Sequence, residues 1–345
     1  MTERKLFTSR SWLAGFAVLA LAAGGTWLYS GYRSFLERPM HTDDQSRVVE
    51  LPAGTSFSGM VAQLKSRGLT EHPWFWRFLA WRRDASERLQ AGEYRVDPGM
   101  RPGQFLDAVV NGRVIQHSFT IVEGWTFDEM LKALSGESNL LHATEGLEAK
   151  QVMARLGHPD QHPEGRFLPE TYHFPRGTED LAVLERAYNA MQRALESAWS
   201  SRDTGLPYDD PREVLILASI IEKETAVPEE RARIAGVFVR RLERGMRLQT
   251  DPTVIYGLGE NYNGNLRRSD LEADNPYNTY TRGGLPPTPI CMPGRASLEA
   301  AVHPEPGSAL YFVSKGDGTH VFSDTLAEHN RAVARYQLNY QSDPK

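Results

Sequence analysis

The hydrophobic pattern begins with one long apolar run near the N-terminus. Residues 12–29 read WLAGFAVLALAAGGTWLY without a charge, and residues 30–32 can extend the run. About 20 apolar residues are enough to cross the hydrocarbon core of a bilayer as a helix. We therefore predict a transmembrane helix at 12–32. Basic residues in the tail 1–11, which are Arg4, Lys5 and Arg10, favour a cytoplasmic N-terminus.

A cleaved signal peptide is the alternative interpretation of this run. Ala22, Ala23 and Gly24 are small residues of the kind found at cleavage sites. The run is longer than an ordinary signal core, however, and Trp27 and Tyr29 are typical of a membrane interface. We favour a retained anchor, and under either interpretation the rest of the chain lies outside the cytoplasm. The polar residues 33–47 are predicted to form a linker.

A strand–glycine–helix pattern then occurs three times. An extended apolar segment precedes each of Gly54, Gly99 and Gly124. Large apolar residues follow six and ten positions after each glycine, as expected for one face of a short helix; these are Met60, Leu64, Phe105, Val109, Met130 and Leu134. Any strand-turn-helix unit gives this pattern, but the units also resemble the carbohydrate-binding LysM module. We predict a LysM-like subdomain at 48–160.

Five aromatic residues fall within eight positions in this region: Trp74, Phe75, Trp76, Phe78 and Trp81. Aromatic rings can stack on sugar faces, but at this spacing some of them must pack in the core. We expect most of the five to be core residues.

The second half of the chain changes to long helices and ordered loops. Helices are predicted at about 180–202, from about 212 and from Pro228, and a hairpin is predicted at 309–322 around Gly316-Asp317-Gly318. A last helix is expected at about 325–341. Together these elements predict an α+β protein whose mixed α/β catalytic domain spans 161–345.

The stretch LILASIIEKETAV, residues 215–227, carries the first candidate for chemistry. Residues 214–221 are apolar on every side, so this helix is expected to be buried in the middle of the domain. Glu222 lies four residues after Ala218 and continues the buried stripe, whereas Glu224 is rotated away by about 200°. Burial raises the pKa of a carboxyl group and makes it a general acid at neutral pH. A helix-terminal carboxylate paired with Lys223 or Arg233 is the equally open alternative.

Two polar loops supply candidate ligand-binding residues. The first contains Gln249, Thr250, Asp251 and Tyr256, and the second contains Asn278 and Tyr280. Amide, hydroxyl and phenol groups on Pro- and Gly-rich loops donate and accept hydrogen bonds without needing a charged ligand. This composition favours a saccharide over a phosphate.

Composition narrows the remaining possibilities. The chain is 40% hydrophobic and 24% charged, as in an ordinary globular protein, and its net charge of −5 gives no sign of a nucleic-acid partner. The single cysteine, Cys291, excludes an intramolecular disulfide. His303, His320 and His329 are too scattered for a zinc site. We therefore expect neither a metal nor a cofactor.

The motifs of the second half resemble one known family. ASIIEKETAVPEERARIAGVFVRRLERGMRLQTDPTVIYGLG, EGRFLPETYHF at 164, YNTY at 277, GLPPTPI at 284 and HVFSDTLAEHN at 320 are similar to those of the endolytic murein transglycosylases (the MltG or YceG-like proteins). The resemblance covers nearly the whole chain. It implies an anchor in the cell inner membrane, a periplasmic catalytic domain, and work beside the peptidoglycan synthases of elongation or division.

The resemblance implies cleavage of the β-1,4 bond between N-acetylmuramic acid and N-acetylglucosamine in nascent peptidoglycan strands. The products end in 1,6-anhydromuramic acid, and chain elongation stops. It further implies that Glu222 is the catalytic acid and that the polar loops bind the sugars. Glu170 stands in a motif where a shorter acid is common, so its expected substrate-binding role is the weakest match. A hydrolase with Asp251 as partner carboxylate and a non-catalytic wall-binding scaffold are the alternatives.

Overall fold

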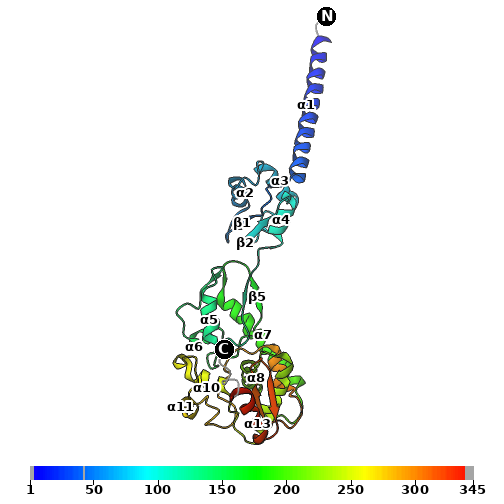
Figure 1. Ribbon diagram of the computed structural model, residues 1–345. Helices are drawn as coiled ribbons and strands as arrows, with labels where there is room; N and C mark the ends of the chain where they lie inside the picture. The colour runs from blue at the N-terminus through cyan, green and yellow to red at the C-terminus, as the bar shows by residue number, and fades with distance from the viewer. Residues whose placement is uncertain (1–3, 42, 339–345) are drawn as a thin grey trace, which may run out of the picture. The chain divides into compact units, whose positions relative to one another are not determined.

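The computed structural model describes residues 4–41 and 43–338. The chain is a mixed α+β protein that separates into two compact units at His117 and Ser118 (Figure 1). Each unit is described by itself below.

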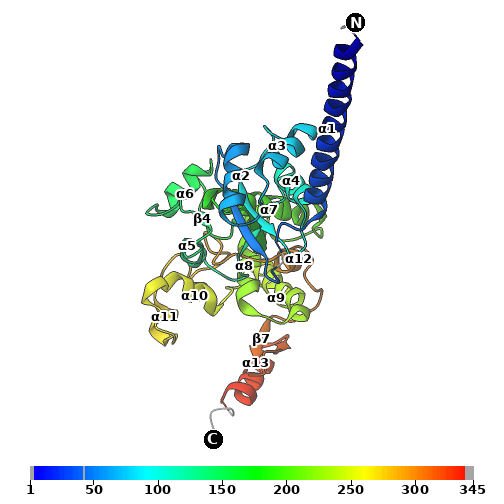
Figure 2. The same cartoon turned by 90° about the horizontal axis from the view of Figure 1, so that it is seen from above.

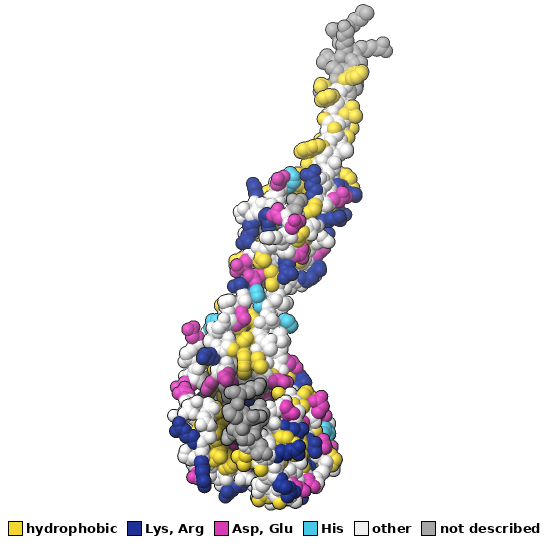
Figure 3. Space-filling view, viewed as in Figure 1, with side chains coloured by type: hydrophobic (Ala, Val, Ile, Leu, Met, Phe, Trp, Pro, Cys, Tyr) yellow, Lys and Arg dark blue, Asp and Glu magenta, His cyan; other side chains and the backbone are white. Residues whose placement is uncertain are grey.

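The first unit begins with the long helix α1, Arg4–Glu37, which contains the predicted apolar run. Its segment from Trp12 to Glu37 is long and apolar enough to cross a membrane. The space-filling view shows hydrophobic side chains along this helix (Figure 3). The helix also continues into the predicted linker, where Tyr32 and Phe35 are buried against the rest of the unit. The prediction of a membrane-spanning helix is therefore compatible with the structure.

The rest of the first unit is a two-stranded sheet with three short helices. The strands β1, Arg47–Leu51, and β2, Gly92–Val96, pair antiparallel with Val49 opposite Tyr94. Between them lie α2, Phe57–Ser66, and α3, Pro73–Arg82, and α4, Pro102–Val110, follows β2. The inward residues of both strands and helices form one core.

The predicted strand–glycine–helix pattern is present in all three places. Gly54, Gly99 and Gly124 have φ angles of 79°, 80° and 80°, a left-handed conformation that glycine adopts most easily. All six apolar residues predicted to face inward are fully buried. The third copy belongs to the second unit, because its strand β3, His117–Thr120, pairs with β5, Thr171–Phe174. The two compact units therefore divide at His117 and Ser118, whereas the subdomain predicted from the sequence ran to residue 160.

The five clustered aromatic residues divide between core and surface. Phe75 and Trp76 are buried, as expected for core residues. Trp74, Phe78 and Trp81 are 49%, 44% and 73% exposed. The expectation that most of the cluster packs in the core therefore fails for three of the five rings.

The second unit is built around the helix α8, Pro211–Glu224, which packs against α7, α9, α10 and α12. Figure 2 labels all four of these helices around α8. Their bounds are Asp180–Ser201 for α7, Arg231–Glu243 for α9, Asp251–Leu258 for α10 and Arg295–Val302 for α12. Residues 214–221 of α8 are all buried, as their sequence predicts.

Smaller elements complete the second unit: α5, Phe127–Ser135; β4, Leu140–Leu141; α6, Ala149–Arg155; β6, Thr178–Glu179; and α11, Arg268–Glu272. The predicted hairpin is formed by β7, Tyr311–Ser314, and β8, His320–Ser323. The last α-helix, α13, spans Leu326–Val333, is capped by the Thr325 hydroxyl and is followed directly by a π-helix at Ala334–Leu338. The end of the predicted helix, 339–341, lies outside the described residues.

Candidate active site

A cleft of about 530 Å³ lies in the second unit beside the last turn of α8. Glu224 lines it, together with three of the residues predicted to bind substrate: Gln249, Asp251 and Tyr280. Its opposite wall comes from the hairpin and the last helix, with Tyr311, Phe312, His320 and His329 among its residues. The cleft therefore combines one helix-terminal carboxyl group with amide, phenol and aromatic groups.

Glu224 has the properties of a proton donor. Its Oε1 accepts a hydrogen bond from the hydroxyl of Thr250, a residue that is 2% exposed. Burial raises the pKa of Glu224 to about 7, and the nearby charge of Asp251 adds to this shift, while the Thr250 hydrogen bond and the positive Arg241 oppose it. A carboxyl group with this pKa is partly protonated at neutral pH, as general acid catalysis requires.

A network of hydroxyl groups holds the two polar loops together behind Glu224. Thr279 Oγ1 accepts from Thr250 N at 3.1 Å and lies 2.9 Å from Thr253 Oγ1. Gln249 N donates to Thr279 O at 3.2 Å, and Gln249 has a φ of 49°. A side chain with this left-handed backbone is uncommon and costs about 1–2 kcal/mol. The cleft is thus shaped by a constrained turn immediately before α10.

Asn278 supports this loop from inside the protein. Its amide nitrogen donates to the carbonyl oxygens of Asp270, Leu271 and Ala273, and its oxygen accepts from Tyr280 N at 2.9 Å. The side chain is fully buried, so its hydrogen bonds are used within the protein. Asn278 therefore positions Tyr280, whereas the sequence had predicted that it binds the substrate directly.

Tyr280 and Asp251 form a pair at the mouth of the cleft. The Tyr280 hydroxyl donates to Asp251 Oδ1 at 2.5 Å. Arg241 lies deeper and donates to the carbonyl oxygens of Leu248 and Leu310, both at 2.7 Å. The sequence pattern assigns no role to Arg241, yet its charge reaches both Glu224 and Tyr280.

Glu222 lies on another side of the same helix end. Its Oε2 accepts from Gly294 N at 2.9 Å and from Ser297 Oγ at 2.7 Å, at the start of α12. Its Oε1 is 3.6 Å from Arg231 Nη2, and the Glu222 side chain is only 6% exposed. Glu222 is buried, as its helical phase predicts. These contacts attach the Glu222 side chain to Arg231 and to the start of α12, and its predicted catalytic role stays a prediction.

Tyr256 and Glu170, like Thr250 and Asn278, are predicted binding residues that do not line the cleft. The Tyr256 hydroxyl donates to Glu164 Oε2 at 3.0 Å, and Glu164 Oε1 accepts from Phe127 N at 3.0 Å. Burial raises the pKa of Glu164 to about 7. Glu170 forms an exposed ion pair with Arg295 at 2.9 Å. Their predicted contact with substrate has no support in this arrangement.

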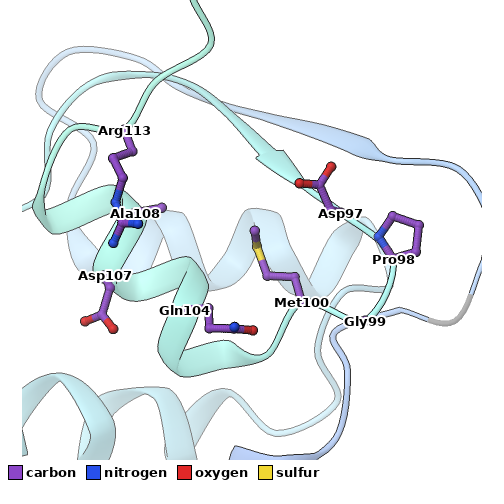
Figure 4. Close-up of a pocket in the computed structure, with 8 residues that line it drawn as sticks. All are labelled: Asp97, Pro98, Gly99, Met100, Gln104, Asp107, Ala108 and Arg113. Carbon is purple, nitrogen blue, oxygen red and sulfur yellow. The ribbon is translucent and has the colours of Figure 1, made fainter.

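The first unit carries a separate polar pocket of about 410 Å³ between the end of β2 and α4 (Figure 4). The turn at Gly99 forms one wall, and Gln104, Asp107 and Arg113 contribute polar side chains. Among the residues that the structure describes, no three His, Cys, Asp or Glu side chains gather as a metal site would require.

The chain is similar to known proteins over most of its length. The profile of the YceG-like family matches residues 49–335. An endolytic murein transglycosylase of Bacillus subtilis strain 168 is 32% identical over 343 residues, which cover 92% of this chain and 91% of the relative. An endolytic murein transglycosylase of Streptococcus pneumoniae serotype 2 strain D39 is 27% identical, and the match spans 63% of that longer protein.

A solved structure is also similar. The crystal structure of a YceG-like protein from Listeria monocytogenes covers 84% of this chain with a TM-score of 0.52 and 31% sequence identity. The family match spans most of the chain, and the relatives named above are transglycosylases. The chain therefore belongs to the YceG-like family and is an enzyme of the lytic transglycosylase class.

Proposed function

We propose that this enzyme cleaves the β-1,4 bond between N-acetylmuramic acid and N-acetylglucosamine in nascent murein strands, with Glu224 as its general acid and base. The observation that carries this proposal is the position of Glu224, whose pKa is raised to about 7, in the cleft lined by Gln249, Asp251 and Tyr280. Glu222, the acid expected from the sequence, is proposed instead to hold Arg231 and the start of α12 in place.

The reaction needs only one carboxyl group. Protonated Glu224 donates its proton to the glycosidic oxygen as the bond to muramic C1 breaks. The resulting carboxylate then accepts the proton of the C6 hydroxyl while that oxygen attacks C1. The products are a 1,6-anhydromuramic end and a free hydroxyl on N-acetylglucosamine, so no water is consumed.

The other groups of the cleft have roles that follow from their charge. Developing positive charge at C1 is stabilised by nearby negative groups, and Asp251 carries such a group into the cleft. Tyr280 fixes the orientation of Asp251 through its 2.5 Å hydrogen bond. The Gln249 amide can donate and accept, which suits the N-acetyl and hydroxyl groups of the sugars.

A glycan hydrolase is the second candidate, because Asp251 places a second carboxylate in the cleft with Glu224. In that reaction Asp251 activates water or forms a covalent bond to the sugar. The products differ, since a hydrolase leaves a reducing muramic acid that is heavier by one water than the anhydro product.

The first unit suggests how the enzyme is held at its substrate. We propose that α1 is a single-pass inner-membrane anchor with a cytoplasmic N-terminus, and that the catalytic unit is periplasmic. We further propose that the sheet and helices at 47–110 act as a LysM-like module whose pocket beside Gln104 binds glycan. We also propose that the enzyme works beside the synthases of elongation or division. Its cleavage of nascent strands would terminate glycan growth.

Matched variants test the catalytic assignment. Purified full-length protein is incubated with glycan strands, and anhydromuramic ends are counted by chromatography. Glu224→Gln should abolish these ends while strands still bind, and Glu222→Gln should retain activity if it is folded. Full activity in Glu224→Gln, or selective loss in folded Glu222→Gln, would return the catalytic role to Glu222.

A further inference from the structure

The helix α3 presents an aromatic face that neither the core nor the proposed reaction uses. Trp74, Phe78 and Trp81 are spaced by four and three residues, so they lie on one side of this helix. We call them the aromatic face of α3. They are 49%, 44% and 73% exposed, whereas Phe75, Trp76 and Leu79 of the same helix are buried. Three neighbouring exposed rings are more than the single apolar residues scattered over an ordinary surface.

The aromatic face is joined directly to the end of α1. Tyr32 packs edge-on against Phe78 with their ring centroids 4.9 Å apart, and it lies 5.7 Å from Phe75. Phe35 continues the contact, with centroid distances of 5.4 Å to Phe75 and 5.6 Å to Trp76. In both ribbon views α3 lies beside the end of α1 (Figure 1, Figure 2). These ring contacts fix the height of α3 along α1.

The length of the apolar part of α1 indicates which residue lies at the membrane surface, where the chain leaves the bilayer. Its charge-free segment runs from Ser11 to Tyr32, between Arg10 and Arg33. At 1.5 Å per residue this segment is about 33 Å long, close to the ~30 Å thickness of the hydrocarbon core. Tyr32 therefore lies near the boundary between hydrocarbon and head groups, and the residues that touch it share that depth.

The composition of α3 suits this position. Aromatic side chains favour the interface between hydrocarbon and head groups because their rings are apolar and because Trp also has a polar N–H group. The helix sequence PWFWRFLAWR contains two arginines and no acidic residue. Arg77 and Arg82 are exposed and can pair with lipid phosphates.

We propose that the aromatic face of α3 inserts into the head-group region of the bilayer that α1 spans. The first unit then rests on the membrane surface, and α1 and the rest of the first unit move as one body. This inference depends on α1 spanning the bilayer and does not depend on the proposed reaction.

Labelled full-length protein in phospholipid nanodiscs tests the proposal. The only native cysteine, Cys291, is buried, and burial raises the pKa of its thiol, so introduced cysteines are labelled selectively. A polarity-sensitive fluorophore is attached to Phe78→Cys or Trp81→Cys. Ala91→Cys is the matched control, because Ala91 is exposed and lies outside α3, immediately before β2. Leu19→Cys reports on the anchor itself.

The expected result is a blue-shifted emission at positions 78 and 81 that is lost with head-group-labelled quencher lipids. Iodide in the water should quench the Ala91→Cys label much more than these two. Water-exposed labels at both positions would overturn the inference, whatever Leu19→Cys reports. Labels that are exposed to water in nanodiscs but protected on addition of glycan strands would also overturn it and would assign the face to sugar stacking. Thermal unfolding of each variant checks that the exposed substitutions leave the fold intact.

Discussion

Replacement of Glu224 by Gln should remove activity and, at alkaline pH, make the protein more stable. Gln has nearly the same shape and can still accept the hydrogen bond from Thr250, but it carries no proton to donate. General acid–base groups contribute about 10²–10⁴-fold to rate, and Glu224 is proposed to act first as acid and then as base. We therefore expect Glu224→Gln to lose activity by an amount near the upper end of this range, about 10³–10⁴-fold.

The stability effect follows from the raised pKa. Burial raises the pKa of Glu224 from 4.5 to about 7. Well below pH 4.5 both the folded and the unfolded chain hold the proton, so the shift costs nothing. As the pH rises toward 7 the unfolded chain releases its proton first, and the folded state loses stability relative to it. The loss is about 1 kcal/mol at pH 5 and reaches about 3 kcal/mol at pH 8, where it levels off.

Chemical denaturation of the two proteins at pH 5 and pH 8 measures this difference. Glu224→Gln should gain stability over the unmodified chain, with a larger gain at pH 8 than at pH 5. Glu164 also has a pKa raised to about 7, but it is present in both proteins, so its contribution cancels in the stability difference between them. The activity of the unmodified chain should fall as the pH rises above about 7. An equal stability difference at both pH values would refute the claim that Glu224 is buried with its proton.

The remaining predictions concern Glu222 and the loops. Glu222→Gln should lose about 1–3 kcal/mol of unfolding free energy, because it removes the buried negative charge 3.6 Å from Arg231, while its activity stays within about tenfold of normal. Asn278→Ala should destabilise the protein by about 2–4 kcal/mol in denaturation experiments, since three buried carbonyl contacts are lost. Gln249→Gly should leave the melting temperature unchanged or raise it, because glycine tolerates the φ of 49°, but it should lower kcat/KM about tenfold through the lost amide. Tyr280→Phe should lower kcat about tenfold with stability within about 1 kcal/mol, since Asp251 loses its 2.5 Å hydrogen bond. A folded Asn278→Ala protein of unchanged stability, or a fully active Tyr280→Phe protein, would contradict the roles given to these residues.

Elements with strong local signals could be predicted from the sequence. The apolar run gives α1, and the glycines at 54, 99 and 124 mark turns that need a left-handed backbone. Helical periodicity and the loop prolines predict both ends of α7 and the start of α8 to within about a residue of those observed. Each of these features is determined by a few neighbouring residues, so it can be predicted from the local sequence. The division at residue 117 depends on the pairing of β3 with β5, which are far apart in the chain.

The choice between Glu222 and Glu224 could not be made from helical phase. An amphipathic helix has one buried face, but α8 is buried all round, so both carboxylates of its last turn meet other parts of the protein. Glu222 meets the start of α12, and Glu224 meets Thr250 and the cleft. Asn278 shows the same limit, because a sequence does not reveal whether an amide is used inside the protein or offered to a ligand.

The central claim is that Glu224 drives an anhydro-forming cleavage without water. Its most direct test is mass spectrometry of products made by the full-length enzyme from purified glycan strands in water enriched with heavy oxygen. Anhydromuramic ends that contain no heavy oxygen are predicted, and Glu224→Gln should produce none of them. Reducing muramic ends that carry one heavy oxygen atom would contradict the account and identify a hydrolase.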